Sequence, residues 1–337
     1  MSYEIVARPH ESNFIAWSAD KPQVIVLTGD LTNSCEVGKW RDTYPERYFS
    51  MGMAEQNMLG VAAGLAREGF QPWLHTFSVF LYRRPLDQLE MAIAYPALPV
   101  RLVGFLPGIT TPGGVTHQPI EDIAVLRAIP NMTVLEVGDA TEVESVIDIA
   151  HAIDGPVYIR QLRGEVSRMF AKDEPMVFNQ ARQLSTGTDI SLLTSGIMTE
   201  EALRALPLIA SRGVSIDHLH VSTLKPFTDE RVLASLSKVS KAVITMENHS
   251  IVGGLGSAVA EVMAENSIGT RLSRIGVQDT YAHGASQKYL MAELGLDARA
   301  LVNRVEFAIG ESLSISDAEL SESRIVDVHS AAKAEAL

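Results

Sequence analysis

Short runs of β-branched and apolar residues alternate with longer stretches of helical periodicity along most of this 337-residue chain. Val24–Leu27 is such a run and ends at a Thr-Gly-Asp turn, whereas residues 54–67 repeat small and apolar side chains at helical spacing. Strands that alternate with helices favour parallel sheets covered on both faces. The pattern therefore predicts an α/β fold in which each sheet is mainly parallel and is flanked by helices.

The same alternation continues to about residue 160, stops over a polar stretch and then resumes. The chain thus divides into a first domain at 1–170, a linker at 171–187, a second domain at 188–325 and a tail at 326–337. Each domain is long enough to bury its own core. The further strands expected are 99–105, 132–137, 156–160, 189–194, 215–220 and 242–247, and the further helices are 120–128, 140–153, 200–211, 229–237 and 254–265.

Composition excludes several classes of partner. The net charge is −13 and no Lys/Arg-rich run occurs, so a nucleic acid backbone would be repelled by the average surface. No apolar run reaches the roughly 18–20 residues of a membrane span, and the first residues lack the layout of a signal peptide. The single cysteine, Cys35, fits a reducing compartment, and we expect a cytoplasmic protein.

The segment FSMGMAEQN places Glu55 in the first turn of a helix of small residues. Free backbone N–H groups and the helix dipole favour negative charge there, so an ordinary first-turn glutamate would explain the residue by itself. Other chemistry-bearing residues lie near the ends of the predicted strands, where open α/β sheets place their ligand clefts. These residues are Phe77, Phe80, His117 and Arg163. Each also has a purely structural reading, as a core aromatic, a satisfied histidine or a surface charge.

Taken in order, these motifs resemble the C-terminal half of the transketolases. The matching strings are MAEQN, HTFxxF and GGVTHQPIED, followed by HVSTLKPF and MENHSIVGGLGSA. The resemblance covers roughly residues 20–310. It implies a pyrimidine-binding domain followed by a transketolase C-terminal domain, and the transfer of a two-carbon ketol unit between sugar phosphates.

The resemblance also implies roles for individual residues. Glu55 would hydrogen-bond the aminopyrimidine of thiamine diphosphate, and Phe77 and Phe80 would pack against that ring. His117 would lie near the reacting hydroxyl groups as a general acid or base. Arg163 would bind the terminal phosphate of the substrate through its planar guanidinium.

The string GDLTNS follows the first buried strand and matches a family segment near the cofactor and the acceptor channel. Asp30 and Leu31 would therefore contact the cofactor, and Ser34 would contact substrate. Turns of this kind are common after any strand, so the match at these three residues is less specific.

One half of the family's cofactor site is missing from this sequence. Transketolases hold the diphosphate and Mg²⁺ through an N-terminal domain with a GDG…N motif, and this chain contains no GDG. A large subunit would have to supply that domain and bind the Mg²⁺. We therefore expect an α2β2 assembly in which this chain is inactive alone.

Two positions depart from the family pattern. Gly113 stands where relatives that use aldose acceptors carry an aspartate that recognises the acceptor's C2 hydroxyl. This difference suggests a non-standard ketose, or a branched sugar such as apulose 4-phosphate, or a sulfonated sugar. Arg83 stands where the family often has tyrosine. Arg83 and Arg84 would then face a substrate anion or, as the preferred reading, form salt bridges at a subunit interface.

Other functions remain open on the sequence alone. The β subunit of a 2-oxo acid dehydrogenase E1 also carries such a glutamate on a separate chain, and a deoxyxylulose-phosphate synthase shares the Glu and His motifs. A non-catalytic scaffold or regulatory subunit is the alternative of another class. The glycines at 253, 254 and 256 form a weak nucleotide-binding pattern, and we interpret them as packing residues.

Overall fold

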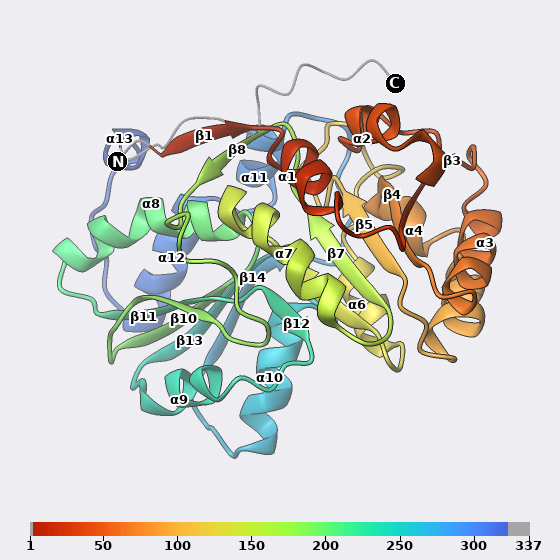
Figure 1. The fold of residues 1–337 in the computed structure, drawn as a ribbon. Coiled ribbons are helices and arrows are strands. Elements are labelled where there is room, and N and C mark those ends of the chain that lie inside the picture. The colour runs from red at the N-terminus through yellow and green to blue at the C-terminus, as the bar shows by residue number, and fades with distance from the viewer. Residues whose placement is uncertain (1–2, 323–337) are drawn as a thin grey trace.

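The computed structural model describes residues 3–322, so the tail expected at 326–337 lies outside the described residues. Two sheets flanked by helices form the body of the molecule (Figure 1). A two-stranded antiparallel ribbon joins β1 (Glu4–Ala7) to β8 (Glu165–Arg168). The expected fold class, two mainly parallel α/β sheets, is confirmed. Within residues 3–322 no helix has both the length and the apolar character that crossing a membrane requires.

The first sheet has seven strands in the order β12-β6-β7-β5-β4-β2-β3, and every neighbouring pair except β12 with β6 is parallel. Its central strands are buried at every residue, because helices cover both faces of the sheet. The strands are β2 (Val24–Thr28), β3 (Tyr48–Ser50), β4 (Gln71–Phe77), β5 (Arg101–Phe105), β6 (Thr133–Glu136), β7 (Val157–Gln161) and β12 (Thr223–Lys225).

The predicted helices of the first half are present, with ends that differ by one or two residues. Helix α7 (Ala140–Ala152) shows why: the Asp139 side chain accepts a hydrogen bond from the Glu142 N–H, and buried apolar residues recur at every third or fourth position. The other helices are α1 (Pro9–Trp17), α2 (Gly38–Thr43), η1 (Pro45–Arg47), α3 (Glu55–Arg67), α4 (Ser78–Tyr82), α5 (Leu86–Gln88), η2 (Leu89–Ala94) and α6 (Asp122–Ala128).

The second sheet has five strands in the order β14-β13-β10-β11-β9, parallel except for β9. The three predicted strands of this half are confirmed, and β14 at the edge is an addition. The strands are β9 (Arg182–Ser185), β10 (Ile190–Thr194), β11 (Ile216–His220), β13 (Ala242–Ser250) and β14 (Leu272–Val277). The helices are α8 (Met198–Ser211), α9 (Glu230–Lys238), α10 (Leu255–Glu265), α11 (Gln287–Glu293), α12 (Ala298–Ile309) and α13 (Asp317–Glu322).

The two halves of the chain interlock more closely than the sequence indicates. Strand β12 comes from the second half but pairs with β6 of the first sheet. Residues 171–187, expected to form only a linker, contain β9, which pairs with β11. Both clusters of buried apolar residues draw on both halves. Each cluster therefore spans both sheets.

Candidate functional site

Five neighbouring strands of the first sheet end at one edge, and the loops that follow them form the candidate site. Strands β7, β5, β4, β2 and β3 are parallel and adjacent, so their carboxyl ends lie together. In this strand order the loops contribute Arg163, then His117, then Phe77 and Phe80, then Asp30, Leu31 and Ser34, and finally Glu55 at the start of α3.

Glu55 is buried, with 3% of its surface exposed, and is the first residue of α3. Its Oε1 accepts a 2.8 Å hydrogen bond from Nη1 of Arg84, whose side chain is half exposed. Gly29, which follows β2, packs closely against Thr76, because a Cβ there would lie 3.2 Å from the Thr76 hydroxyl oxygen; it would lie at an ordinary contact distance of 3.7 Å from this Oε1. That hydroxyl is buried and has no hydrogen-bond partner among the described residues.

Phe77 and Phe80 form a stacked pair beside this carboxylate. Their ring centroids are 6.1 Å apart at an interplanar angle of 27°. The guanidinium carbon of Arg84 lies 4.2 Å from the centroid of Phe80. A planar cation therefore both hydrogen-bonds Glu55 and covers Phe80 in this structure. A flat heterocycle with a protonated ring nitrogen would make the same two contacts, so the residues present fit an aminopyrimidine.

His117 faces both aromatic rings edge-on, with centroid distances of 6.1 Å to Phe77 and 5.6 Å to Phe80. Its Nδ1 is 2.9 Å from the Thr116 hydroxyl, which leaves Nε2 for a substrate. Partial burial, and next the positive charge of Arg84, lower the pKa of His117 below its usual value. At neutral pH the imidazole is therefore neutral and able to accept a proton.

Replacing Arg84 by glutamine should raise the pKa of His117 toward its usual value, because the substitution removes one of the two causes that lower it. The midpoint of the His117 ring-proton titration, followed by NMR, should move to higher pH. The exposed Arg67 at the end of α3 offers a control, since Arg67→Gln removes the same charge at a position that is not among the causes of the shift. An unchanged midpoint in Arg84→Gln would contradict the assigned influence of Arg84.

Arg163 lies next to the aromatic pair and to the loop after β2. Its guanidinium carbon is 5.4 Å from the centroid of Phe77, and Nη1 donates a 2.8 Å hydrogen bond to the backbone carbonyl of Ser34. The neighbouring Gly164 N–H donates to Oε1 of Glu36 at 2.6 Å. Burial raises the pKa of Glu36 to about 7, although this hydrogen bond and the charges of Arg8 and Arg163 act in the opposite direction. The structure thus brings Ser34 and Arg163 together.

Glu36 is absent from the sequence-based set of candidates. The only signal in the sequence was an acidic residue between two apolar ones, Cys35 and Val37. In the structure both of these neighbours are fully buried. Asp30, at the start of the same loop, is exposed and adopts a left-handed backbone conformation with φ of 65°. Leu31 is partly buried and packs against the core. Asp30 thus offers an exposed carboxylate at the carboxyl end of β2, and Leu31 anchors the loop that follows.

Arg83 forms its salt bridge within the chain, and the expectation that it lies at a subunit interface stays a prediction. Nε of Arg83 donates to Oε1 of Glu121 at 2.7 Å, within the same subunit. Its two terminal nitrogens donate to the carbonyls of Val115 and Gln118 at 2.9 and 3.3 Å. Arg83 therefore braces the loop that carries His117. Arg84, which was grouped with it, belongs to the site through Glu55.

The glycine-rich segment before α10 is a packing feature, as expected. Glu247 accepts hydrogen bonds from the N–H groups of Leu255 and Gly256 at 2.7 and 2.9 Å, so a carboxylate already occupies this helix N-terminus. A Cβ on Gly254 would collide with Oε2 of Glu247. No room is left for a phosphate. Among residues 3–322 no group of three or more His, Cys, Asp or Glu side chains is arranged to hold a metal ion.

The carboxyl edge of the first sheet carries a carboxylate, an aromatic pair, a histidine and an arginine. This arrangement is typical of a ligand-binding α/β domain, and here a second α/β domain follows it. Two family models match the chain: "Transketolase, pyrimidine binding domain" over residues 10–168 and "Transketolase, C-terminal domain" over residues 179–301.

Individual proteins show the same similarity. A protein of Clostridium sp. (strain MSTE9) described as "6-deoxy-6-sulfo-D-fructose transketolase subunit SqwH" is 40% identical over 83% of this chain and 87% of its own length. The 1-deoxy-D-xylulose-5-phosphate synthase of Chlorobium phaeovibrioides is 34% identical over 84% of this chain but only 45% of its own length. A solved structure described as "Split gene transketolase, inactive beta4 tetramer" has a TM-score of 0.82 at 34% identity, covering 90% of this chain and 97% of that chain. The chain therefore belongs to the transketolase family.

Proposed function

We propose that this chain is the small subunit of a two-chain transketolase and binds the aminopyrimidine end of thiamine diphosphate. The observation that carries the proposal is the buried Glu55 at the start of α3, placed beside the Phe77–Phe80 pair in a chain of this family. A carboxylate in such a position has a planar, positively charged partner in the structure, namely Arg84. A protonated pyrimidine ring is a ligand of the same shape and charge.

Each residue of the site then has a physical task. Bound thiamine diphosphate supplies a carbon nucleophile and an electron sink for ketol transfer. Glu55 stabilises positive charge on the pyrimidine nitrogen, and Phe77 and Phe80 determine which face of the ring is covered. His117 exchanges a proton with a substrate hydroxyl at Nε2, because Thr116 holds its Nδ1. Arg163 binds the terminal anion of the sugar.

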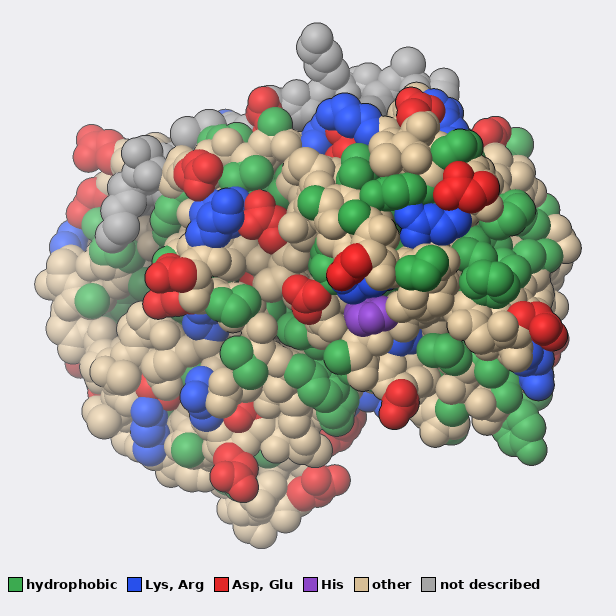
Figure 2. Space-filling view, in the orientation of Figure 1, with side chains coloured by type: hydrophobic (Ala, Val, Ile, Leu, Met, Phe, Trp, Pro, Cys, Tyr) green, Lys and Arg blue, Asp and Glu red, His purple; other side chains and the backbone are tan. Residues whose placement is uncertain are grey.

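A large subunit completes the site in this proposal, as an α2β2 assembly, and holds the diphosphate and Mg²⁺. Large apolar side chains are exposed on β3 and α3 and between them: Phe49 on β3, Met53 before α3 and Val61 on α3, with 43%, 79% and 37% of their surfaces exposed. Figure 2 shows hydrophobic side chains gathered on this side of the molecule, over β3 and α3. Exposed apolar patches of this kind mark protein interfaces. The split-gene relative is described as inactive in a tetramer of its β chain, which supports inactivity of the chain alone.

The proposed substrate is a ketose carrying a terminal phosphate or sulfonate. One relative acts, by its name, on 6-deoxy-6-sulfo-D-fructose. Gly113 supports an acceptor other than an ordinary aldose, because glycine offers no carboxylate to bind an acceptor hydroxyl. A Cβ at this position would lie 2.9 Å from Cβ of His117, so a larger residue would displace the histidine. The half-exposed guanidinium of Arg84 adds positive charge beside Glu55.

Calorimetric titration with thiamine diphosphate and Mg²⁺ tests the two-chain site. We expect saturable binding by the mixture of this chain with its large subunit, and no tight binding by this chain alone. Activity of the mixture should then be compared with 6-deoxy-6-sulfofructose and fructose 6-phosphate as donors. Tight binding of the cofactor by this chain alone would overturn the proposal of a split site.

A deoxyxylulose-phosphate synthase is the second candidate, favoured by the 34% identity to such an enzyme. The chain spans about half the length of that relative. Incubation of the mixture with pyruvate and glyceraldehyde 3-phosphate separates the candidates. Release of CO₂ with formation of a five-carbon product would identify the synthase, whereas ketol transfer between sugars would identify the transketolase.

A further inference from the structure

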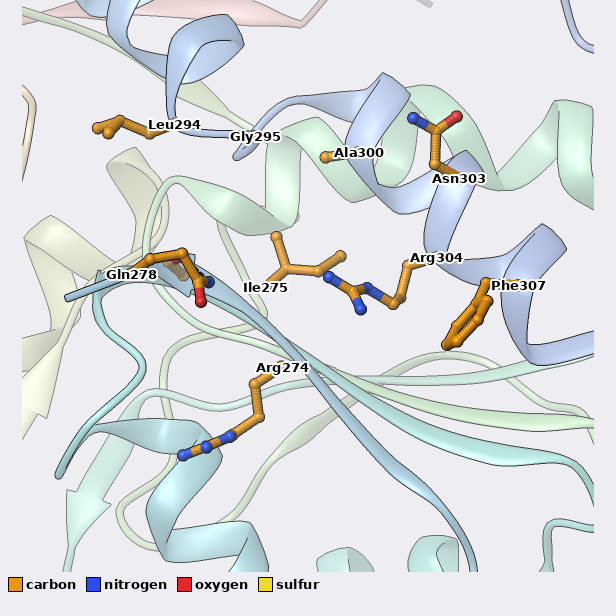
Figure 3. Close-up of a pocket in the computed structure, with 10 residues that line it drawn as sticks. Arg274, Ile275, Gln278, Leu294, Gly295, Ala300, Asn303, Arg304 and Phe307 are labelled. Atoms are coloured by element: carbon orange, nitrogen blue, oxygen red, sulfur yellow. Dashed lines mark hydrogen bonds between the residues drawn. The ribbon is translucent and has the colours of Figure 1, made fainter. Parts of the chain in front are cut away.

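A pocket of about 330 Å³ lies between the outer edge of β14 and helix α12 (Figure 3). Ala300, Arg304 and Phe307 reach it from α12 at helical spacing, so one face of the helix forms a wall. The opposite wall is β14, which is an edge strand of the second sheet. Every residue that lines the pocket belongs to the second half of the chain, so the pocket is separate from the candidate site around Glu55.

The pocket has positive charge without a compensating acid. Two arginines line it, Arg274 and Arg304, and no Asp or Glu does. Nη1 of Arg274 donates to the carbonyl of Ile251 at 2.6 Å, and Figure 3 shows this side chain turned away from Arg304. Arg304 is partly buried, reaches toward Ile275 and forms no hydrogen bond or ion pair within residues 3–322. In a chain of net charge −13, such an arginine is a suitable partner for an anion from solution.

Uncharged groups around Arg304 suit the rest of a small sugar-like ligand. Asn303 and Gln278 provide amide groups at the rim, and Nε2 of Gln278 already donates to the carbonyl of Gly276 at 3.0 Å. The next residue, Val277, accepts a hydrogen bond from the Ile251 N–H on the β13 side, so the carbonyl and the N–H of Gly276 face the open side of the strand. Phe307 has 56% of its surface exposed and supports the guanidinium of Arg271, 4.1 Å from the ring centroid.

We propose that this pocket binds a small hydroxylated organic anion, of the phosphorylated or sulfonated sugar class. Arg304 binds the anionic group, with Arg271 adding charge beside it. The amides of Asn303 and Gln278 and the outer edge of β14 hydrogen-bond hydroxyl groups, and the Phe307 ring packs against the C–H face of the sugar. The inference goes beyond the proposed function, because it assigns a second ligand site to the C-terminal domain.

Fructose 6-phosphate, added to the full chain labelled with ¹⁵N-glycine, is the probe. Gly276 and Gly295 line the pocket and report on it locally, apart from any binding at the candidate site around Glu55. We expect saturable shifts of these two amides, weaker binding of inorganic phosphate and none of fructose. Arg304→Gln should weaken binding about 10-fold to 100-fold, as expected when a charged hydrogen-bond partner is lost.

Arg299→Gln provides the matched control. Arg299 lies on the same helix but pairs with Asp317 outside the pocket, so this variant should bind the probe as the unmodified chain does. Unchanged thermal unfolding would show that both variants are folded. The proposal is overturned by the absence of saturable shifts, or by binding that Arg304→Gln leaves intact. Equal affinity for inorganic phosphate and fructose 6-phosphate would also overturn the assignment to sugars.

Discussion

Glu55→Gln should reduce the turnover of the assembled enzyme by about 10²-fold to 10⁴-fold, the range typical of lost proton-transfer assistance. Glutamine has the shape of glutamate and its carbonyl can still accept the hydrogen bond from Arg84, so the site should keep its geometry. A neutral amide cannot stabilise a positive charge on a pyrimidine nitrogen. We expect the loss in kcat, measured with saturating thiamine diphosphate and donor.

Glu68→Gln is the control for this substitution. Glu68 is exposed at the opposite end of the same helix, so losing its charge should leave turnover and stability nearly unchanged. The unfolding temperature of both variants should match that of the unmodified chain. Full turnover in Glu55→Gln would mean that the carboxylate has no catalytic part. If cofactor binding also remained unchanged, the scaffold or regulatory reading would then be favoured.

The site was more predictable than the packing around it. Glu55, Phe77 and His117 carry chemistry that depends on residue type and order along the chain, and parallel strands necessarily bring their carboxyl ends together. The sequence could therefore indicate which residues share an edge. It could not show that Arg84 would fill the position opposite Glu55, because that contact depends on how the short helix α4 turns after β4.

The sequence-based predictions mainly lacked contacts between segments that are distant along the chain. Strand β12 is only three residues long and joins the sheet of the other half, so its pattern is too short to reveal its partner. Strand β14 contains Ser273 and Arg274, and its burial is uneven because it lies at an edge. The partner of Arg83 could not be predicted from the sequence, because Glu121 is 38 residues away along the chain.

The sequence also does not reveal a charged network that joins the two halves, because its members are distant along the chain. Arg160 is fully buried at the end of β7 and is bonded to Asp122 through Nε at 2.8 Å and through Nη2 at 3.1 Å. Its Nη1 donates to Glu136, and Nη2 also reaches the carbonyl of Asn248 on β13 at 3.1 Å. One arginine thus connects α6, β6 and β7 with a strand of the second sheet. Its two acidic partners raise the pKa of Arg160, whereas burial opposes them.

Arg160→Met should destabilise the fold by about 3–5 kcal/mol, the range observed when one partner of a buried ion pair is removed. Asp122 and Glu136 would remain buried without their cation, and the tie to β13 would be lost. Urea unfolding of the purified chain measures the change. Arg299→Met, which breaks an ion pair whose Asp317 side chain is 89% exposed, should cost at most about 1 kcal/mol.

A triple variant distinguishes the effect of the unpaired charges on stability from the effect of altered packing. Arg160→Met combined with Asp122→Asn and Glu136→Gln removes both stranded charges. The amide carbonyl introduced at position 122 can still accept the hydrogen bond that Tyr158 now donates to Asp122 at 2.6 Å. Most of the lost stability should return, because the cost of Arg160→Met lies in the unpaired carboxylates rather than in the missing guanidinium. If the triple variant were no more stable than Arg160→Met, the loss would instead come from packing at the junction of the two sheets.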